Sequence, residues 1–123
     1  MTTDKLLLSI IELGGYPDFT SVYEQAGYRV LTLKSVRKAI QQLKQDTPQM
    51  VVAEFNFQSD FRDRTSSLES LLAVVERIPD CKVVVFYEKE YAHQLERLCQ
   101  RHSFHAMLPF PIEPEQLAAV VRR

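Results

Sequence analysis

Cysteine and glycine are scarce in this chain of 123 residues, and each scarcity excludes a class of protein. Cys81 and Cys99 are the only cysteines; they lack the C-x-x-C spacing of metal sites, and two cysteines do not form a disulfide framework. The three glycines form no phosphate-binding loop, and no nucleophile-elbow motif is present. We therefore expect a protein that is not an enzyme, has no cofactor or metal, and keeps two reduced thiols in the cytoplasm.

An excess of positive charge and a long hydrophobic run are also missing. The formal net charge is -1, so no basic excess is available to neutralise a phosphate backbone, and we expect no direct nucleic acid partner. The longest apolar stretches have the length of a strand, far below the roughly 20 residues of a membrane-spanning helix. The N-terminal residues do not resemble a signal peptide. These absences predict a cytoplasmic protein that does not contact a membrane.

The three histidines do not indicate a metal site. His102 and His105 are three residues apart, but they straddle the end of a predicted helix and a turn. No acidic residue or cysteine is clearly paired with them. We therefore interpret His93, His102 and His105 as surface residues.

Strand and helix patterns alternate along the whole chain, which has the length of one domain, 1–123. Hydrophobic residues make up 46% and charged residues 25%, a balance typical of a globular protein. Short apolar runs predict strands, and apolar residues at helical spacing predict helices between them. The strands are expected at 5–13, 28–33, 49–55, 82–87 and 106–108. The helices are expected at 18–26, 35–45, 66–78, 90–102 and 113–123.

Several residues mark the ends of these helices. Asp18, Ser35 and Ser66 can each cap a helix N-terminus, because their side-chain oxygens accept a hydrogen bond from a free backbone N–H group. Gly27 follows the first helix at the position where glycine often ends one. Pro114 suits the first position of the last helix.

Five apolar strands that alternate with helices predict one α/β architecture. Strands that are apolar along their whole length suit a parallel sheet covered on both faces. Right-handed crossovers then favour a flavodoxin-like (βα)5 three-layer sandwich, with strand order 2-1-3-4-5.

Three segments, in order and with matching spacing, resemble parts of a receiver domain of bacterial response regulators. Residues 24–30 resemble the junction of its first helix and second strand. Residues 47–54, TPQMVVAE, resemble its third strand, usually written P-D-L-V-L-L-D. Residues 107–117, MLPFPIEPEQL, resemble its fifth strand and helix, usually Y-L-x-K-P-F-x-P-E-E-L. The resemblance covers the whole chain and implies the receiver fold.

The same resemblance places substitutions at the positions of receiver chemistry. Glu54 stands where receivers carry the phosphate-accepting aspartate. Receivers hold a divalent cation with two acidic residues after the first strand, and here the pair is Ile11 and Glu12. A backbone carbonyl two residues after the acceptor also binds the cation, and Asn56 could supply it.

Three further positions are replaced in the second half of the chain. The serine or threonine that ends the fourth strand in receivers is Phe86, within one residue. The lysine before proline that follows the fifth strand is Phe110. The switch aromatic on that strand is Met107. Transfer of a phosphoryl group to a carboxylate needs its charge neutralised by metal and cation, so the resemblance implies a receiver without this reaction.

Glu54 itself allows three interpretations: a mimic of phospho-aspartate, a solvated remnant at a strand end, or a general base in an unrelated reaction. A runner-up function is a receiver that still accepts phosphate, on Glu54, Asp60 or Asp63. A third is a sensor of small ligands, which predicts an apolar cavity near Phe86 and Phe110. Aromatic residues expected at this edge of the sheet are Phe55, Phe57, Phe61, Phe86, Tyr87 and Phe110.

We therefore predict a degenerate receiver that acts as a protein–protein interaction module in bacterial signal transduction. In receivers the fourth helix, fifth strand and fifth helix bind partners or a second copy. The residues expected on this face are Glu90, His93, Arg97, Arg101 and Pro111. Its mixed charge favours pairing in one register, and a homodimer through this face is one possibility that the resemblance implies.

Overall fold

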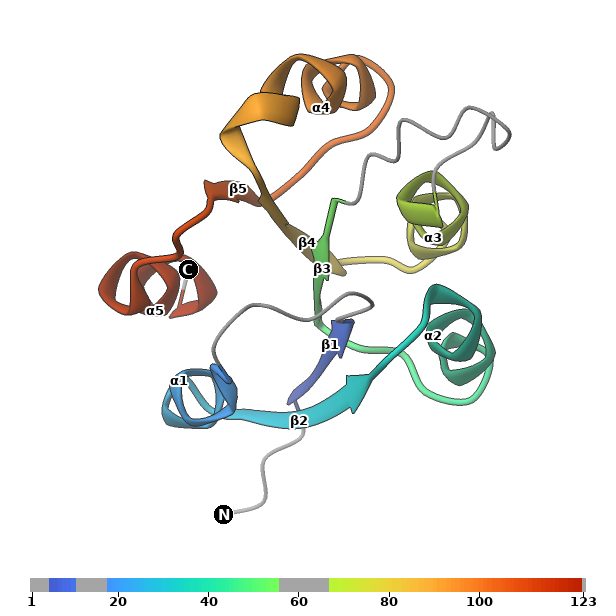
Figure 1. Ribbon diagram of the computed structural model, residues 1–123. Coiled ribbons are helices and arrows are strands. Elements are labelled where there is room, and N and C mark those ends of the chain that lie inside the picture. The colour runs from blue at the N-terminus through green and yellow to red at the C-terminus, as the bar shows by residue number, and fades with distance from the viewer. Residues whose placement is uncertain (1–4, 11–17, 56–66, 123) are drawn as a thin grey trace.

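A computed structural model of the chain describes residues 5–10, 18–55 and 67–122, and within this part a five-stranded parallel sheet forms the centre of the molecule (Figure 1). Its strand order is β2-β1-β3-β4-β5, which confirms the predicted flavodoxin-like architecture. The strands are β1 (Lys5–Ile10), β2 (Tyr28–Leu33), β3 (Met50–Glu54), β4 (Lys82–Tyr87) and β5 (Ala106–Pro109).

Helices cover both faces of this sheet. In chain order they are α1 (Thr20–Gln25), α2 (Val36–Leu43), α3 (Ser67–Val75), α4 (Ala92–Cys99), which follows a 3₁₀ turn at Lys89–Tyr91, and α5 (Pro114–Arg122). Figure 1 shows α1 and α5 on one side of the sheet, and α2 and α3 on the other, with α4 beside β4. This arrangement follows from right-handed crossovers between parallel strands.

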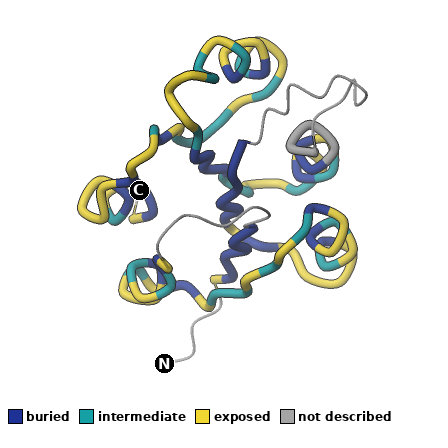
Figure 2. Tube along the Cα trace, viewed as in Figure 1, coloured by how far each residue is buried: buried dark blue, intermediate teal, exposed yellow. Residues whose placement is uncertain are grey.

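The core divides into two apolar clusters, one on each face of the sheet. Successive strand residues point to opposite faces, so Leu7 contributes to the cluster under α1 and α5, whereas Leu8 contributes to the cluster under α2, α3 and α4. Both side chains are fully buried. Figure 2 shows the central strands buried along their length and the outer sides of the helices exposed. The continuous apolar pattern of the strands is therefore explained by burial on both faces.

The helix ends follow several of the predicted signals. The Ser35 Oγ accepts a hydrogen bond from the Lys38 N–H group at 3.1 Å and caps α2. Gly27 follows α1 with a φ of +95°, a conformation that glycine adopts without strain. Asp18 lies before the helix, which begins at Thr20, and its Oδ1 accepts hydrogen bonds from the Thr20 N–H and hydroxyl groups. These two bonds stabilise the carboxylate and lower the pKa of Asp18.

Two predicted helices are too long at their ends. The third helix ends at Val75, because the N–H groups of Arg77 and Ile78 bond three residues back, in the tighter turn that often ends a helix. The fourth was expected at 90–102, but its first turn is 3₁₀ and it ends at Cys99. The predicted cap at Ser66 lies outside the described residues. Among the described helices, none is long and apolar enough to cross a bilayer.

Candidate functional site

The candidate site lies at the carboxyl ends of β3 and β4, the edge of a parallel α/β sheet where ligands usually bind. Glu54 is the last residue of β3 and pairs in register with Phe86 of β4. Only 6% of Glu54 is exposed, and its Oε2 atom is buried. The expectation of a solvated carboxylate at this position is therefore wrong, because the strand end is covered by neighbouring side chains.

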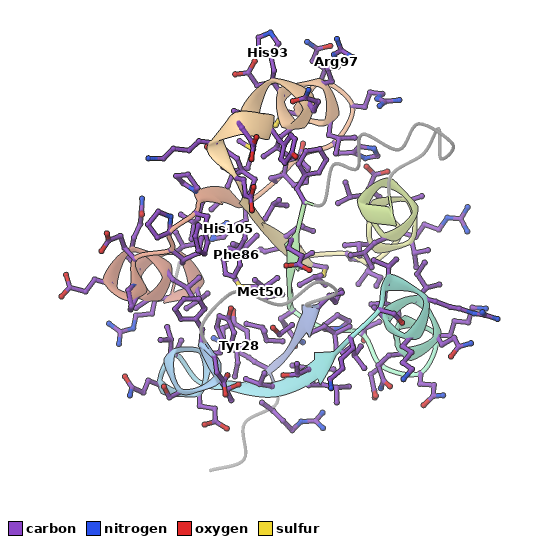
Figure 3. The ribbon with its side chains drawn as sticks, viewed as in Figure 1. Tyr28, Met50, Phe86, His93, Arg97 and His105 are labelled. Atoms are coloured by element: carbon purple, nitrogen blue, oxygen red, sulfur yellow. The ribbon has the colours of Figure 1, made fainter. Side chains whose placement is uncertain are left out.

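Phe86 fills the space beside Glu54 on the face of the sheet that α1 and α5 cover. It is 2% exposed, and its ring meets that of Phe19 edge to face, with centroids 6.0 Å apart and an interplanar angle of 76°. Figure 3 shows Met50 and Phe86 on this same side, between the sheet and the helices. The end of β4 beside Glu54 therefore holds an aromatic ring of the core.

A backbone hydrogen bond holds Phe110 near the carboxyl end of β4. Its N–H group donates a hydrogen bond to the Tyr87 carbonyl oxygen at 2.7 Å, and the peptide bond between Phe110 and Pro111 is cis. The side chain is nevertheless 39% exposed, one of two large hydrophobic residues that the described part of the chain leaves exposed. The ring thus lies near the end of β4 and adds no positive charge there.

The described aromatic residues at this edge lie on both faces of the sheet. Phe55 lies on the opposite face from Phe86, in the cluster under α2, α3 and α4, and Tyr87 packs against that same cluster. These side chains separate because successive residues of a strand point to opposite faces. Phe86 is buried in the core and Phe110 is exposed, and the cavity expected near them stays a prediction. Phe57 and Phe61 lie outside the described residues.

The remaining residues of the predicted acidic site lie outside the described part of the chain. These residues are Ile11, Glu12, Asn56, Asp60 and Asp63. Within the described ranges, no group of three or more histidine, cysteine, aspartate or glutamate side chains is arranged to hold a metal ion. The cation site predicted at these residues and Glu54 therefore stays a prediction, because only Glu54 among them is described.

The predicted partner face is exposed at each of its named residues. Figure 3 shows His93 and Arg97 projecting outward from α4, and the His93 side chain is 87% exposed. Glu90 forms a hydrogen bond with Glu88 that raises the pKa of Glu88, because the bond and the neighbouring charge favour the protonated form. Arg101 and Pro111 are also exposed.

Met107 adds an apolar centre to this face that the sequence did not indicate. It lies on β5, the edge strand, and is 42% exposed, more than any other large hydrophobic residue in the described part. Its Sδ atom is 3.2 Å from the Sγ atom of Cys99 on α4. The pKa of the Cys99 thiol is raised, chiefly by burial and further by the charge of Glu96, so the thiol stays protonated beside the thioether.

Two histidines that were expected on the surface instead join elements. The His102 side chain is 13% exposed and its Nδ1 contacts the Glu76 carboxylate, which connects the end of α4 to the end of α3. His105 precedes β5, and its Nε2–H group donates to the Val120 carbonyl oxygen of α5 at 2.9 Å (Figure 3). The surface interpretation is correct only for His93. The sequence did not predict the contacts of His102 and His105, because Glu76 and Val120 are distant from them in sequence.

No protein-family model and no curated protein matches the sequence. Solved structures do match the fold. A response regulator receiver domain protein from Clostridium thermocellum superposes with a TM-score of 0.73 and 14% identity, covering 95% of this chain and 90% of that one. Vibrio cholerae chemotaxis protein CheY4 superposes with a TM-score of 0.73 and 16% identity, and the match covers 97% of each chain. A sensor protein from Polaromonas sp. JS666 superposes with a TM-score of 0.71 and 20% identity, and the match covers 98% of this chain and 94% of that one. The chain therefore shares the fold of receiver domains.

Proposed function

We propose that this chain is a degenerate receiver domain, a protein–protein interaction module of bacterial two-component signalling that is not phosphorylated at the usual position. The observation that carries this proposal is the pairing of Glu54 with Phe86. Both side chains are buried at the end of the sheet where a receiver would transfer a phosphoryl group. The shared fold supports the assignment to this kind of signalling protein.

The chemistry of the substituted positions supports the loss of phosphotransfer. A phosphoryl group that approaches a carboxylate needs open space and nearby positive charge or hydrogen-bond donors. Phe86 occupies the space beside Glu54 with an apolar ring, and it offers no hydroxyl group. Phe110 supplies an aromatic side chain where receivers supply a lysine ammonium. Glu54 is also one methylene longer than aspartate, which moves the carboxylate out of line.

The burial of Glu54 favours a domain held in one state. A solvated remnant would be exposed, whereas Glu54 as a residue is 6% exposed and belongs to the packed end of β3. A side chain buried in this way leaves little room for a phosphoryl group to approach it. The state of the domain would then be set by its partners and not by a phosphate donor.

The face formed by α4, β5 and α5 is the proposed contact for a protein partner or a second copy of the chain. Met107 and Phe110 are exposed apolar side chains on or next to β5, and charged residues of α4 lie on the same face. An apolar centre within a polar rim is the usual composition of protein interfaces. Methionine and aromatic residues are enriched in such centres.

Phosphotransfer is tested with acetyl phosphate and Mg²⁺, followed by the intact mass of the protein. A receiver domain with an aspartate acceptor serves as the positive control for the reagents. We expect no mass increase for this chain under conditions in which the control gains a phosphoryl group. An acid-stable or base-labile phosphoryl adduct on Glu54, Asp60 or Asp63 would instead support the runner-up function, a phosphorylated receiver.

The partner face is tested by sedimentation over a range of protein concentrations. We expect the wild-type chain to dimerise as concentration rises, and the variant Met107→Glu with Phe110→Glu to stay monomeric, because two charges would be buried at the contact. Gln41→Glu on α2 with Gln45→Glu in the turn after it adds the same charge elsewhere, and this variant should dimerise like the wild type. A wild-type chain that stays monomeric throughout would exclude the homodimer, and a co-purified partner lost only in the first variant would assign the face to another protein.

A further inference from the structure

The exposed side of α2 carries positive charge and no carboxylate. The exposed residues are Arg37, Lys38 and Gln41 of the helix, and Lys44 and Gln45 in the turn that follows it. At 100° per residue all five fall within about one third of the helix circumference. The opposite side of the same helix, with Val36, Ala39 and Leu43, is buried in the core. The cations are therefore concentrated on one outward face.

Two neighbouring cations extend this surface. Lys34 is exposed immediately before the Ser35 cap, and Arg29 is exposed on β2, the edge strand. Residues 29–49 carry five cations and one carboxylate, whereas the rest of the chain carries ten cations and fifteen carboxylates. A chain with a net charge of -1 thus has one strongly basic region, which we call the α2 surface: Arg29, Lys34, Arg37, Lys38 and Lys44.

The fold itself does not account for these charges. In the described ranges, no ion pair joins any of the five cations of the α2 surface to a carboxylate. The one carboxylate in this region, Asp46, accepts a hydrogen bond from the Gln42 Nε2 atom at 2.6 Å. Arg37 and Lys38 lie in the first turn of the helix, where the backbone dipole favours acidic residues, and α2 has none there. Their position is unfavourable for the helix and leaves their charge available to a ligand.

We propose that the α2 surface binds an acidic segment of a partner protein. Cations that form no ion pair with the described residues attract a carboxylate-rich segment and set its orientation by charge complementarity. The part of this surface that lies on the helix is short, since an eight-residue helix is about 12 Å long. A nucleic acid or a membrane would extend past it onto the acid-rich remainder of the chain, and repulsion there disfavours both. A protein segment can place its carboxylates to match the five cations and end where they end.

This surface is separate from the face formed by α4, β5 and α5. The sheet order places β2, next to α2, at one edge and β5 at the other (Figure 1). A partner on one surface therefore leaves the other open. The proposal goes beyond the proposed function and does not depend on the loss of phosphotransfer.

The test measures binding of a labelled oligoglutamate peptide to the full chain by fluorescence anisotropy, at low and at physiological salt. The variant Arg37→Gln, Lys38→Gln, Lys44→Gln is compared with Arg77→Gln, Lys89→Gln, Arg122→Gln, which removes the same charge from exposed positions elsewhere. We expect the first variant to weaken binding roughly tenfold and the control to weaken it by less than about twofold. Amide NMR should place the peptide-induced shifts on α2 and the adjoining part of β2.

Four results would overturn the proposal. One is the absence of peptide binding at either salt concentration. Another is an equal loss of peptide affinity in the control variant, which would mean that the peptide responds to the overall charge of the chain and not to the α2 surface. The third is tighter binding of a single-stranded oligonucleotide or of phosphatidylserine vesicles than of the peptide, because the partner would then be nucleic acid or membrane. The last is a set of NMR shifts centred on α4 and β5. The amide spectrum of each variant without peptide shows that it is folded.

Discussion

Phe86 and Phe110, two aromatic residues near the carboxyl end of β4, play different physical roles. Phe86 is 2% exposed and packs on Phe19, so it adds to the core that α1 closes. Phe110 is 39% exposed and stands at the end of β5. One of these two rings thus belongs to the core and the other to the surface.

This difference predicts unequal costs of truncation. Phe86→Ala should lower the free energy of unfolding by about 3–5 kcal/mol, because it leaves a cavity and removes the contact with Phe19. Phe110→Ala should lower it by less than about 1 kcal/mol, since much of its ring is in water already. Urea denaturation of both variants measures the two values. Similar losses would contradict the assignment of Phe86 to the core and Phe110 to the surface.

Cys81 predicts a dependence of stability on alkaline pH. Burial raises the pKa of the Cys81 thiol to about 11, whereas an unfolded chain titrates near its ordinary value of about 8.5. The unfolded state therefore loses this proton first, so the contribution to stability is complete below about pH 8.5 and is lost as the pH rises to about 11. When unfolding is measured under reducing conditions between about pH 8 and 11, the free energy of unfolding should fall less steeply with pH for Cys81→Ala than for the wild type.

Cys99→Ala is the control for this experiment, because the Cys99 thiol is less buried. Tyr23 and Tyr28 also have raised pKa values through burial, and they contribute with the same sign at higher pH in every variant. The difference in pH dependence between Cys81→Ala and the wild type therefore reports the contribution of the Cys81 thiol alone. Parallel curves for the wild type and Cys81→Ala would show that Cys81 titrates alike in both states.

At the scale of elements, α2 shows local features that were predictable and one that was not. The Ser35 cap and the buried stripe of Val36, Ala39 and Leu43 follow from the spacing of the residues. That the cations on the other side form no ion pair with the residues the structure describes could be seen only in the structure, because ion pairs depend on which elements are neighbours. The overall charge of -1 hid this region when only the whole chain was counted.

The charges of α2 predict opposite effects at its two ends. Arg37→Glu with Lys38→Glu should raise the free energy of unfolding by about 0.5–1 kcal/mol, because acidic residues in the first turn interact favourably with the helix dipole. Lys44→Glu, at the carboxyl end, should lower it by a few tenths of a kcal/mol for the same reason. Urea denaturation at low salt measures both. If the first variant is less stable than the wild type, the cations hold the fold together and are not available for a partner.

At the scale of the whole molecule, the fold was predictable because its pattern is repeated. Most residues of each strand are apolar, and each helix has one apolar stripe, so an error at one helix end leaves the strand order unchanged. The predicted strand order 2-1-3-4-5 is confirmed, although several helix ends were placed wrongly.

The site was less predictable, because burial at a strand end depends on side chains that come from other elements. Glu54 is covered in a region where Phe19 of the loop before α1 packs on Phe86 of β4, and nothing near Glu54 in the sequence signals that contact. The contacts of His102 and His105 likewise join residues that are distant in sequence. Residue types at the site could be named in advance, but their exposure could not.

The measurement that tests the central claim most directly is a titration of the chain with Mg²⁺ and beryllofluoride, followed by backbone amide NMR. Beryllofluoride occupies the phosphoryl position of a receiver whose acceptor and cation site are intact. The account predicts no saturable shifts at the amides of Glu54, Phe55, Phe86 and Tyr87. Saturable shifts confined to these amides would contradict it and would show that the chain retains a phosphorylation site.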